Sequence, residues 1–304
     1  MKHWYLVLLA SLAGAYSPLM AQPGAAYSTE IEHWHKDRIE GLKAPGGWLN
    51  LVGLYWLEEG RSSFGSGPDN KIVFPAGTIA GTAGYFERKG KTVRLIVADP
   101  VNITLDGKPA KDVIIFDKDS VRQPVLACGS LRWTIIQRDD KIGIRLRDLN
   151  SSLVTTFKDI DRYPVDTAWR IDAVFQPAQV PGTIAITNII GQTSQQRSPG
   201  KLVFTVHNTR YSLDALDEGN ELFIVFADAT NGKTTYPSGR FLAVAKPTSP
   251  DNATVIDFNK AYNPPCAFTN YATCPLPPRQ NVLPIDIEAG EKNFGHHSLN
   301  QGYQ

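Results

Sequence analysis

The stretch LRWTIIQRDDKIGIRL, residues 131–146, decides the fold class of this chain. Its two apolar runs, Leu131–Gln137 and Ile142–Leu146, flank the polar residues Asp139-Asp140-Lys141. Short runs of strand-forming residues on either side of a polar turn are typical of a β-hairpin. The stretch therefore predicts two antiparallel β-strands.

The same pattern recurs upstream of this hairpin. Tyr85–Arg88 and Thr92–Val97 flank Lys89-Gly90-Lys91, and Asp106-Gly107 is a dipeptide that readily adopts the positive φ angles of a tight hairpin turn. Further strands are expected at Trp48–Leu57, Lys71–Phe74 and Val101–Leu105. Short strands with turns at this spacing indicate a β-sandwich or barrel.

A second strand-rich block follows Tyr163-Pro164. Its strands are expected at Trp169–Phe175, Thr183–Ile190, Leu202–His207, Leu222–Ala227, Phe241–Ala245 and Thr254–Phe258. The predicted fold is mainly β, with two packed sandwich-like or barrel-like halves. We place the first half at residues 28–165 and the second at residues 166–294.

One helix is expected before the first strand. Thr29 and Glu32 have the spacing of a capping box, in which each side chain satisfies a backbone N–H of the first turn. Four apolar residues then fall near one helical face: Ile31, Trp34, Ile39 and Leu42. Ala44-Pro45-Gly46-Gly47 ends the predicted helix.

Residues 1–21 have the pattern of a secretory signal peptide. A short polar start precedes the apolar run Trp4–Ala15, which is too short to span a bilayer. We expect cleavage before Gln22, with a cut after Ala15 as the alternative. No later stretch approaches the roughly 18 apolar residues of a membrane span. The predicted product is a soluble protein exported to the periplasm or the medium, with a mobile tail at residues 295–304.

Composition excludes several classes of protein. The 304 residues are 42% hydrophobic and 20% charged, so a packed core is expected rather than disorder. The 31 Lys and Arg residues nearly balance the 30 Asp and Glu residues. Such a chain has no global positive field for nucleic acid, and no nucleic-acid partner is expected.

The segment Asn259–Asn281 combines five prolines with aromatic residues and two cysteines. Its prolines exclude a regular helix or a central strand, and its aromatic residues favour packing against the body of the protein. In an exported protein, Cys266 and Cys274 are expected to form a disulfide. A free thiol nucleophile and two inert buried thiols are the alternatives, and Cys128 is expected to be a buried free thiol.

Three stretches carry a resemblance to a known family: GLYWLEEGRSSFGSGPDN (53–70), TTYPSGRFL (234–242) and DFNKAYNPPCAFTNYATCPLPPRQNVLPIDIEAGEK (257–292). Together they resemble the family of bacterial and archaeal proteins of unknown function numbered 1684. The resemblance extends from Trp34 to Lys292. It implies no particular activity.

The first half is also weakly similar to a forkhead-associated β-sandwich. The similarity rests on the order of Gly53–Leu57, Phe64-Gly65, Asp69–Val73 and Leu105–Lys108. Phosphopeptide-binding members of that family use an Arg and a His in loops that here contain neither residue. The resemblance therefore implies a sandwich scaffold and no phosphothreonine recognition.

Familiar catalytic motifs are missing from the chain. It has no nucleophile elbow, zinc-protease motif, P-loop or dinucleotide fingerprint, so no cofactor and no metal site are expected. His33 and His35 lie two residues apart on the predicted helix and should point in different directions, so we expect surface positions for both. His207 would be the histidine of any Ser–His–Asp triad, and its position on a hairpin strand does not favour one.

The best candidate site in the sequence is polar and aromatic. It comprises Tyr236, Arg240, Asp257, Asn259, Tyr262 and Asn263. Arg240 offers a fork of donors for a carboxylate or phosphate, and tyrosines offer flat faces for a sugar or an aromatic ring. The structural alternative is an Arg240–Asp257 ion pair that ties the proline-rich segment to the sheet.

Three functions compete at this stage. The favoured one is a binding module for a small polar ligand or glycan. The second is a hydrolase-like enzyme of unfamiliar type, with Asp257 and Glu291 as acid and base beside Arg240. The third is a protein-interaction module on the first sandwich. The oligomeric state stays open.

Overall fold

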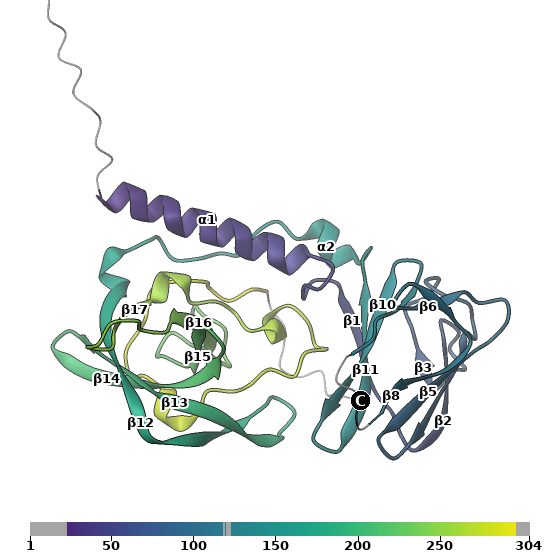
Figure 1. The fold of residues 1–304 in the computed structure, drawn as a ribbon. Coiled ribbons are helices and arrows are strands. Elements are labelled where there is room, and N and C mark those ends of the chain that lie inside the picture. The colour runs from purple at the N-terminus through teal and green to yellow at the C-terminus, as the bar shows by residue number, and fades with distance from the viewer. Residues whose placement is uncertain (1–22, 118, 120–122, 296–304) are drawn as a thin grey trace, which may run out of the picture.

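The computed structural model describes residues 23–295, apart from residue 118 and residues 120–122. The predicted signal peptide and the predicted tail beyond Gly295 lie outside this range. Two β-rich halves lie beside each other, and helix α1 (Pro23–Lys43) runs along the second half and ends near the first (Figure 1). Among the described residues, no helix is long and apolar enough to cross a membrane. The predicted mainly β fold is confirmed.

The first half is a sandwich of two antiparallel-rich sheets. One sheet has the strand order β1-β11-β10-β9-β6-β7 and the other has the order β3-β2-β4-β5-β8. The strands are β1 (Leu51–Trp56), β2 (Gly60–Gly65), β3 (Ile72–Val73), β4 (Gly84–Lys89), β5 (Thr92–Val97), β6 (Ile103–Leu105), β7 (Lys108–Ala110), β8 (Asp112–Phe116), β9 (Leu126–Cys128), β10 (Leu131–Arg138) and β11 (Lys141–Asp148). The hairpins predicted at β4–β5 and β10–β11 are both present.

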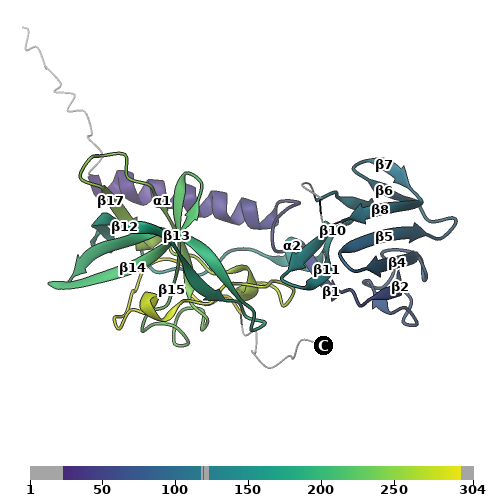
Figure 2. The same cartoon turned by 60° about the horizontal axis from the view of Figure 1, so that its bottom comes forward.

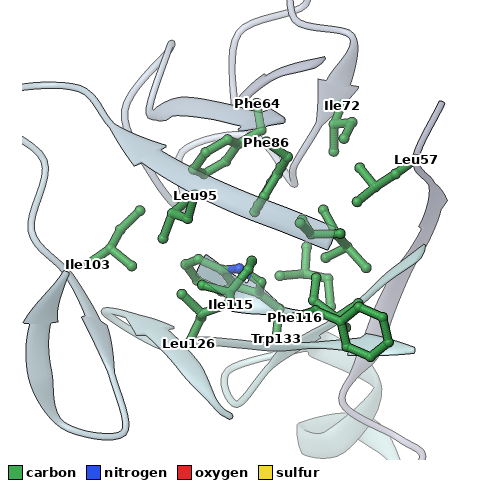
Figure 3. Close-up of a cluster of buried hydrophobic side chains, with 14 of the residues drawn as sticks. Leu57, Phe64, Ile72, Phe86, Leu95, Ile103, Ile115, Phe116, Leu126 and Trp133 are labelled. Carbon is green, nitrogen blue, oxygen red and sulfur yellow. The ribbon is translucent and has the colours of Figure 1, made fainter. Parts of the chain in front are cut away.

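The sandwich core is aromatic at its centre (Figure 3). Trp133 of β10 is fully buried, and its ring meets Phe74 edge-on with centroids 5.7 Å apart. Phe64 and Phe86 pack from the opposite sheet with centroids 4.3 Å apart. Buried aromatic rings supply the largest apolar areas in a core, so these side chains hold the two sheets together.

The second half is one strongly curved sheet with the strand order β16-β15-β14-β13-β12-β17. Its strands are β12 (Arg170–Thr187), β13 (Thr193–Val206), β14 (Thr209–Glu218), β15 (Glu221–Phe226), β16 (Arg240–Ala245) and β17 (Ala253–Asp257). The Thr254 hydroxyl donates to the Ala245 carbonyl across 2.9 Å, which links the two edge strands. The sheet is therefore a nearly closed barrel.

Two strand predictions in this half differ from the structure. The segment Thr183–Ile190 is not a separate strand, because Thr183–Thr187 is the far end of the long strand β12. The sequence pattern also predicted no strand where β14 lies. Acidic and basic residues alternate with apolar ones along β14, and only the inward set, including Leu213 and Ala215, is buried.

Helix α1 begins earlier than predicted. Its first residue is Pro23, and the Thr29 hydroxyl donates to the Ala25 carbonyl inside the helix instead of capping its start. A proline suits the first helical position because the N–H that it lacks would have no helical partner there. The helix ends at Lys43, directly before the predicted stop. His35 is buried, contrary to its predicted surface position, and its Nε2 lies 2.6 Å from Oδ1 of Asp159.

A third hydrophobic cluster joins the halves, and we call it the junction core. It contains Leu42, Leu49, Phe157, Ile160, Val225, Tyr236, Phe241, Cys266, Ala267, Phe268, Ala272 and Cys274. These residues come from α1 and the loop after it, from the chain that follows the short helix α2 (Ser152–Thr156), from the outside of the barrel and from the proline-rich segment. The proline-rich segment is thus packed into the body of the protein.

The proline-rich segment has little regular structure of its own. Its short 3-10 turns are η2 (Phe258–Lys260), η3 (Pro265–Ala267) and η4 (Arg279–Asn281), and a further one, η1 (Thr167–Trp169), precedes β12. The structure joins Cys266 to Cys274 in a disulfide, with the two Cα atoms 6.1 Å apart. Cys128 is a free thiol, and burial raises its pKa.

Candidate ligand-binding cleft

Arg240, the centre of the site predicted from sequence, is fully buried. Its Nη2 donates to Oδ2 of Asp228 at 2.8 Å and to the carbonyl of Ile287 at 3.0 Å. Its Nη1 donates to the carbonyl of Ala289. The ion-pair partner of Arg240 is therefore Asp228 and not Asp257. Through its bonds to the two carbonyls, Arg240 holds residues 287–291 against the barrel.

The backbone before Arg240 is specialised for this arrangement. Gly239 has φ +93°, a conformation that favours glycine. A Cβ atom at this position would lie 2.6 Å from the Phe226 carbonyl oxygen and 2.5 Å from Cγ of Pro277. Glycine therefore allows the backbone before β16 to lie in close contact with both Phe226 of the barrel and Pro277 of the proline-rich segment.

Asp257 and Asn259 belong to a different network. Oδ1 of Asp257 accepts hydrogen bonds from the Tyr27 hydroxyl at 2.7 Å and from the backbone N–H of Asn259 at 3.1 Å. The Asn259 side chain donates to the Asp166 carbonyl and accepts from the Asp166 N–H. Burial and the hydrogen bond with Asp257 raise the pKa of Tyr27. This network fixes the start of α1 and the entry to β12.

Glu291 and Asn263 lie under the middle of α1. Glu291 is 1% exposed, and its carboxylate accepts from Nε of Arg38 at 3.1 Å and from the backbone N–H of Asn263 at 2.7 Å. The Arg38 guanidinium also lies 4.6 Å from the Tyr262 ring centre. Burial raises the pKa of Tyr262 to about 12. Glu291 and Asp257 thus have separate sets of donors.

Most of the six predicted site residues therefore lie in buried networks and do not face an open site. Tyr236, Arg240, Asn259 and Asn263 are all at most 5% exposed. Asp257 and Tyr262 line a groove of about 290 Å³ beside α1, where Lys260 bonds to Glu30 at 2.6 Å.

A larger cavity, of about 520 Å³, lies where the two halves meet. Its lining residues are Trp48, Arg138, Arg145, Ile186, Asn188, Ser194, Gln196, Leu216, Glu218, Phe223, Phe241, Pro265, Ala272, Thr273, Cys274 and Pro275. The outer face of β10–β11, the far end of the β12–β13 hairpin, the barrel strands β14–β16 and the disulfide loop all contribute. We call this cavity the junction cleft.

Arg145 is the most unusual residue of the junction cleft. On β11 its neighbours Ile144 and Leu146 point into the sandwich core, so strand alternation points Arg145 outward toward the barrel. Its guanidinium carbon lies 5.5 Å from the Trp48 ring centre, and its buried Nε has no hydrogen-bond partner. Within the described part of the chain, the side chain of Arg145 forms neither an ion pair nor a hydrogen bond. Burial, with the nearby charges of Arg138 and Arg147, lowers its pKa to about 10.

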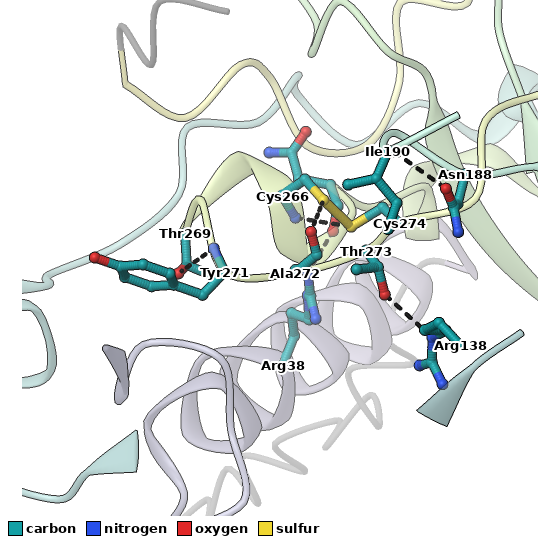
Figure 4. Close-up of a disulfide and its surroundings, with 11 residues drawn as sticks. Arg38, Arg138, Asn188, Ile190, Cys266, Thr269, Tyr271, Ala272, Thr273 and Cys274 are labelled. Atoms are coloured by element: carbon teal, nitrogen blue, oxygen red, sulfur yellow. Dashed lines mark hydrogen bonds between the residues drawn. A yellow bond between two sulfur atoms is a disulfide. The ribbon is translucent and has the colours of Figure 1, made fainter. Parts of the chain in front are cut away.

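Arg138 connects three walls of the junction cleft (Figure 4). Its Nε donates to the Thr273 hydroxyl at 3.3 Å, and its carbonyl accepts from Nε2 of Gln192 at 3.4 Å. Both views of the fold place the tip of the β12–β13 hairpin beside the sandwich (Figures 1 and 2). The side chain of Arg138 thus bonds the sandwich to the disulfide loop, and its backbone carbonyl bonds the sandwich to the hairpin.

The disulfide loop is bonded to the hairpin by its backbone. The N–H of Ile189 donates to the Cys274 carbonyl at 2.9 Å, and the N–H of Leu276 donates to the Thr187 carbonyl at 2.8 Å. The Cys266–Cys274 bridge closes the loop behind these contacts (Figure 4). The loop that carries Thr273 is therefore held both by backbone hydrogen bonds to the hairpin and by the disulfide.

Aromatic rings line the barrel side of the junction cleft. Phe223 and Phe241 meet edge-to-face with centroids 4.9 Å apart. The amide side chains of Asn188 and Gln196 lie on the hairpin wall. Cations, amides and flat apolar faces in one cavity are the usual composition of a small-ligand site.

Comparison with known proteins supports the resemblance seen in the sequence. A family described as "Protein of unknown function (DUF1684)" has a model that covers the barrel and the proline-rich segment. Residues 155–292 match this family. The match leaves out residues 34–154, which the sequence resemblance had included. The DUF1684 region contributes the hairpin, Phe223, Phe241 and the disulfide loop to the junction cleft, whereas Arg138 and Arg145 lie before it.

A solved structure also resembles part of the chain. It is the solution NMR structure of an uncharacterised protein of Haloarcula marismortui, which is 27% identical. The match covers 47% of this chain and 80% of that one, with a TM-score of 0.40. No curated protein matches the chain.

No sequence pattern predicted the residues of the junction cleft as a site. Arg138 and Arg145 were placed in or beside predicted strands, and one signal was present. An arginine among the apolar residues of a hairpin, at an outward position, marks a sheet face that meets polar surroundings. The opposing wall, however, comes from residues 186–275 and is set by tertiary folding.

Proposed function

We propose that the protein is a binding module for a small polar ligand with an acidic group, held in the junction cleft. The observation that carries the proposal is the half-buried, unpaired guanidinium of Arg145. A desolvated cation costs stability unless an anion or acceptor compensates it. A carboxylate or phosphate on a ligand would supply that partner through two parallel hydrogen bonds. Acidic sugars belong to the same class of ligand.

The lining supports a ligand that is flat and partly apolar beyond its acidic group. Trp48 stacks on Arg145, and Phe223 and Phe241 offer ring edges and faces on the barrel side. Asn188 and Gln196 can each donate to and accept from polar groups. The cavity volume of about 520 Å³ is within the range of sites for drug-sized molecules.

The binding test uses simple anions as probes. Isothermal titration should detect benzoate and phenyl phosphate, and it should show weaker or no binding of neutral benzamide. Arg145→Gln should weaken binding of the anions by about ten- to a hundredfold, as expected for a charge-assisted hydrogen bond of roughly 1.5–3 kcal/mol. Equal affinity of the wild type and Arg145→Gln for both anions would contradict the proposal.

Arg132 supplies a matched control. It lies on the same strand as Arg138, outside the cleft lining, and its Nη1 donates to the carbonyls of Gly129 and Leu131. Arg132→Gln removes the same charge from the same sheet. It should leave anion binding unchanged, apart from a small long-range effect that salt screens.

We also propose that the protein is exported. The pattern of residues 1–21 is the basis, and the Cys266–Cys274 disulfide supports it because disulfides persist in oxidising compartments. N-terminal sequencing of the protein from producing cells should give Gln22 as the first residue. A product that begins at Met1 would contradict export by a cleaved signal peptide.

A further inference from the structure

An acidic residue faces the same cavity as the arginines. Glu218 ends strand β14 on the barrel side of the junction cleft. Its neighbour Asp217 is bonded to Nζ of Lys246 at 2.5 Å, but Glu218 has no ion pair or hydrogen bond with any residue that the structure describes. Directly across the hairpin lies Glu221, a second carboxylate. Like charges at facing positions destabilise a strand pair, so Glu221 gives the Glu218 carboxylate no compensation.

Within the part of the chain that the structure describes, the junction cleft therefore has two charged side chains of opposite sign without a charged partner, the half-buried Arg145 and the exposed Glu218. Arg145 belongs to strand β11 of the sandwich and Glu218 to strand β14 of the barrel. Their charges would be compensated together by a ligand that carries an anion at one end and a cation at the other. A ligand with one acidic group alone would leave Glu218 without a partner.

The surface between the two charges suits a peptide. Leu216, Phe223 and Phe241 form an apolar face on the barrel side. Asn188 and Gln196 offer amide groups that match the donors and acceptors of a peptide bond. A free amino acid carries both of its charges on a single carbon, whereas an extended peptide separates them by about 3.3–3.6 Å for each residue.

We propose that the junction cleft binds a short peptide by its two ends, which deepens and rests on the proposed function. The terminal carboxylate lies against Arg145, with Arg138 as the neighbouring cation. The terminal ammonium lies against Glu218. An apolar side chain of the peptide packs on Phe223 and Phe241.

The test compares forms of one tripeptide, Gly-Phe-Gly, by isothermal titration with the full mature protein. The free peptide should bind best. Amidation of its C-terminus should weaken binding about tenfold or more, because it removes the anion that Arg145 pairs with. Acetylation of its N-terminus should weaken binding about three- to tenfold, since Glu218 is exposed and its ion pair is partly screened.

Glu218→Gln and Glu221→Gln form a matched pair of variants. Glu218→Gln should bind the free and the acetylated peptides equally, because the partner of the ammonium is gone. Glu221→Gln should keep the preference for the free peptide, because Glu221 lines the groove beside α1 and not the junction cleft. Circular dichroism spectra of both variants should match the wild type.

The outcomes separate the two proposals. If amidation weakens binding but acetylation does not, the peptide proposal is overturned and the anion site stands. The same holds if benzoate and phenyl phosphate bind but no form of the tripeptide does. If the acid and the amide bind equally and Arg145→Gln has no effect, both proposals fail. Loss of the preference in Glu221→Gln as well as in Glu218→Gln would overturn the assignment to Glu218.

Discussion

One fully buried arginine and one half-buried arginine of this protein are in opposite situations. Arg240 is 0% exposed and donates to a carboxylate and to backbone carbonyls, whereas Arg145 has a ring beneath it and no acceptor among the described residues. A guanidinium with acceptors in the interior is part of the architecture. One that is desolvated without acceptors reduces stability, and it is best explained by a binding partner.

Removal of the Arg145 charge should stabilise the protein. Because the folded-state pKa is lowered to about 10, the unfolded chain holds this proton more tightly, and the cost is fully present at pH 7. The cost falls only as the pH rises through about 10. Arg145→Met keeps the packing on Trp48 and should raise the free energy of unfolding by about 1–2 kcal/mol, after allowance for solvent screening. Urea unfolding at pH 7 measures this, and a loss of stability would show that Arg145 has a structural role.

Removal of the Arg240 charge should destabilise the protein. Arg240→Met leaves the Asp228 carboxylate buried and without its cation, which typically costs about 3–5 kcal/mol. The double variant with Asp228→Asn should lose less than the sum of the single losses, since the two residues interact directly. Urea unfolding of the three variants measures the coupling. If Arg240→Met were as stable as the wild type but no longer bound phenyl phosphate, Arg240 would be a ligand-binding residue instead of a structural one.

At the scale of elements, α1 is attached to the barrel and to the connecting chain by side-chain pairs. Glu30 bonds to Lys260 at 2.6 Å, and Glu32 bonds to Arg162 at 2.5 Å. These contacts join the N-terminal helix to residues more than a hundred positions away. The helix thus lies along the second half, is bonded to it by these pairs, and ends near the first half (Figure 1).

The attachment of α1 should weaken in acid. The hydrogen bonds from Lys260 and Arg162 lower the pKa values of Glu30 and Glu32 in the folded state. Their stabilisation is therefore present above the ordinary glutamate pKa of 4.5 and is lost as the pH falls through the lower folded-state values. Each exposed pair is worth at most about 1 kcal/mol. Thermal unfolding between pH 7 and pH 3 should show this loss.

A matched set of glutamine variants isolates the contribution of these pairs. Glu30→Gln and Glu32→Gln should have a smaller loss of stability between pH 5 and pH 3 than the wild type. Glu40→Gln is the control, because among the described residues the carboxylate of Glu40 pairs with Lys36 alone, in an exposed helical pair at 3.9 Å. An equal acid loss in all three variants would contradict the assignment.

At the scale of the whole molecule, the junction core decides whether the cleft exists. Sandwich and barrel each have their own hydrophobic cluster, and a third cluster lies between them. Three residues that line the junction cleft also belong to that third cluster: Phe241, Ala272 and Cys274. The relative position of Arg145 and Glu218 therefore depends on packing between the halves.

Phe268→Ala should uncouple the halves. Phe268 is 1% exposed and packs on Phe157 and Phe294, with ring centroids 6.2 and 5.0 Å apart. Truncation of a buried Phe costs about 3–5 kcal/mol, and here the loss falls on the junction core alone. Calorimetry should show one transition for the wild type and two for the variant, together with weaker binding of phenyl phosphate. A single transition at lower temperature would mean that the halves unfold as one unit without this contact.

Local interactions explain what could be predicted from the sequence. Strand alternation and turn residues are properties of neighbouring residues, so the hairpins at residues 85–97 and 131–146, the end of α1 and the mainly β class followed from the order of side chains. The Cys266–Cys274 bridge joins residues 8 positions apart and was the favoured prediction for an exported protein, with free thiols as the alternatives. Two local features were missed: the charged outer face of β14 obscured its strand pattern, and α1 begins at Pro23, before the predicted capping residue Thr29.

The junction cleft and the partner of Arg240 required the tertiary structure. Arg145, Asn188, Glu218 and Thr273 lie far apart in the chain, and no local pattern specifies which distant surfaces will meet. The polar cluster around Arg240 was recognised, yet burial gave it Asp228 and the carbonyls of residues 287–291 as partners. Sequence order alone determined most of the strands and turns, because short-range backbone preferences decide them, and it favoured the disulfide over free thiols. Packing between the halves decided which charges are paired in the interior and which are left for a ligand, because desolvation depends on neighbours that only the folded chain brings together.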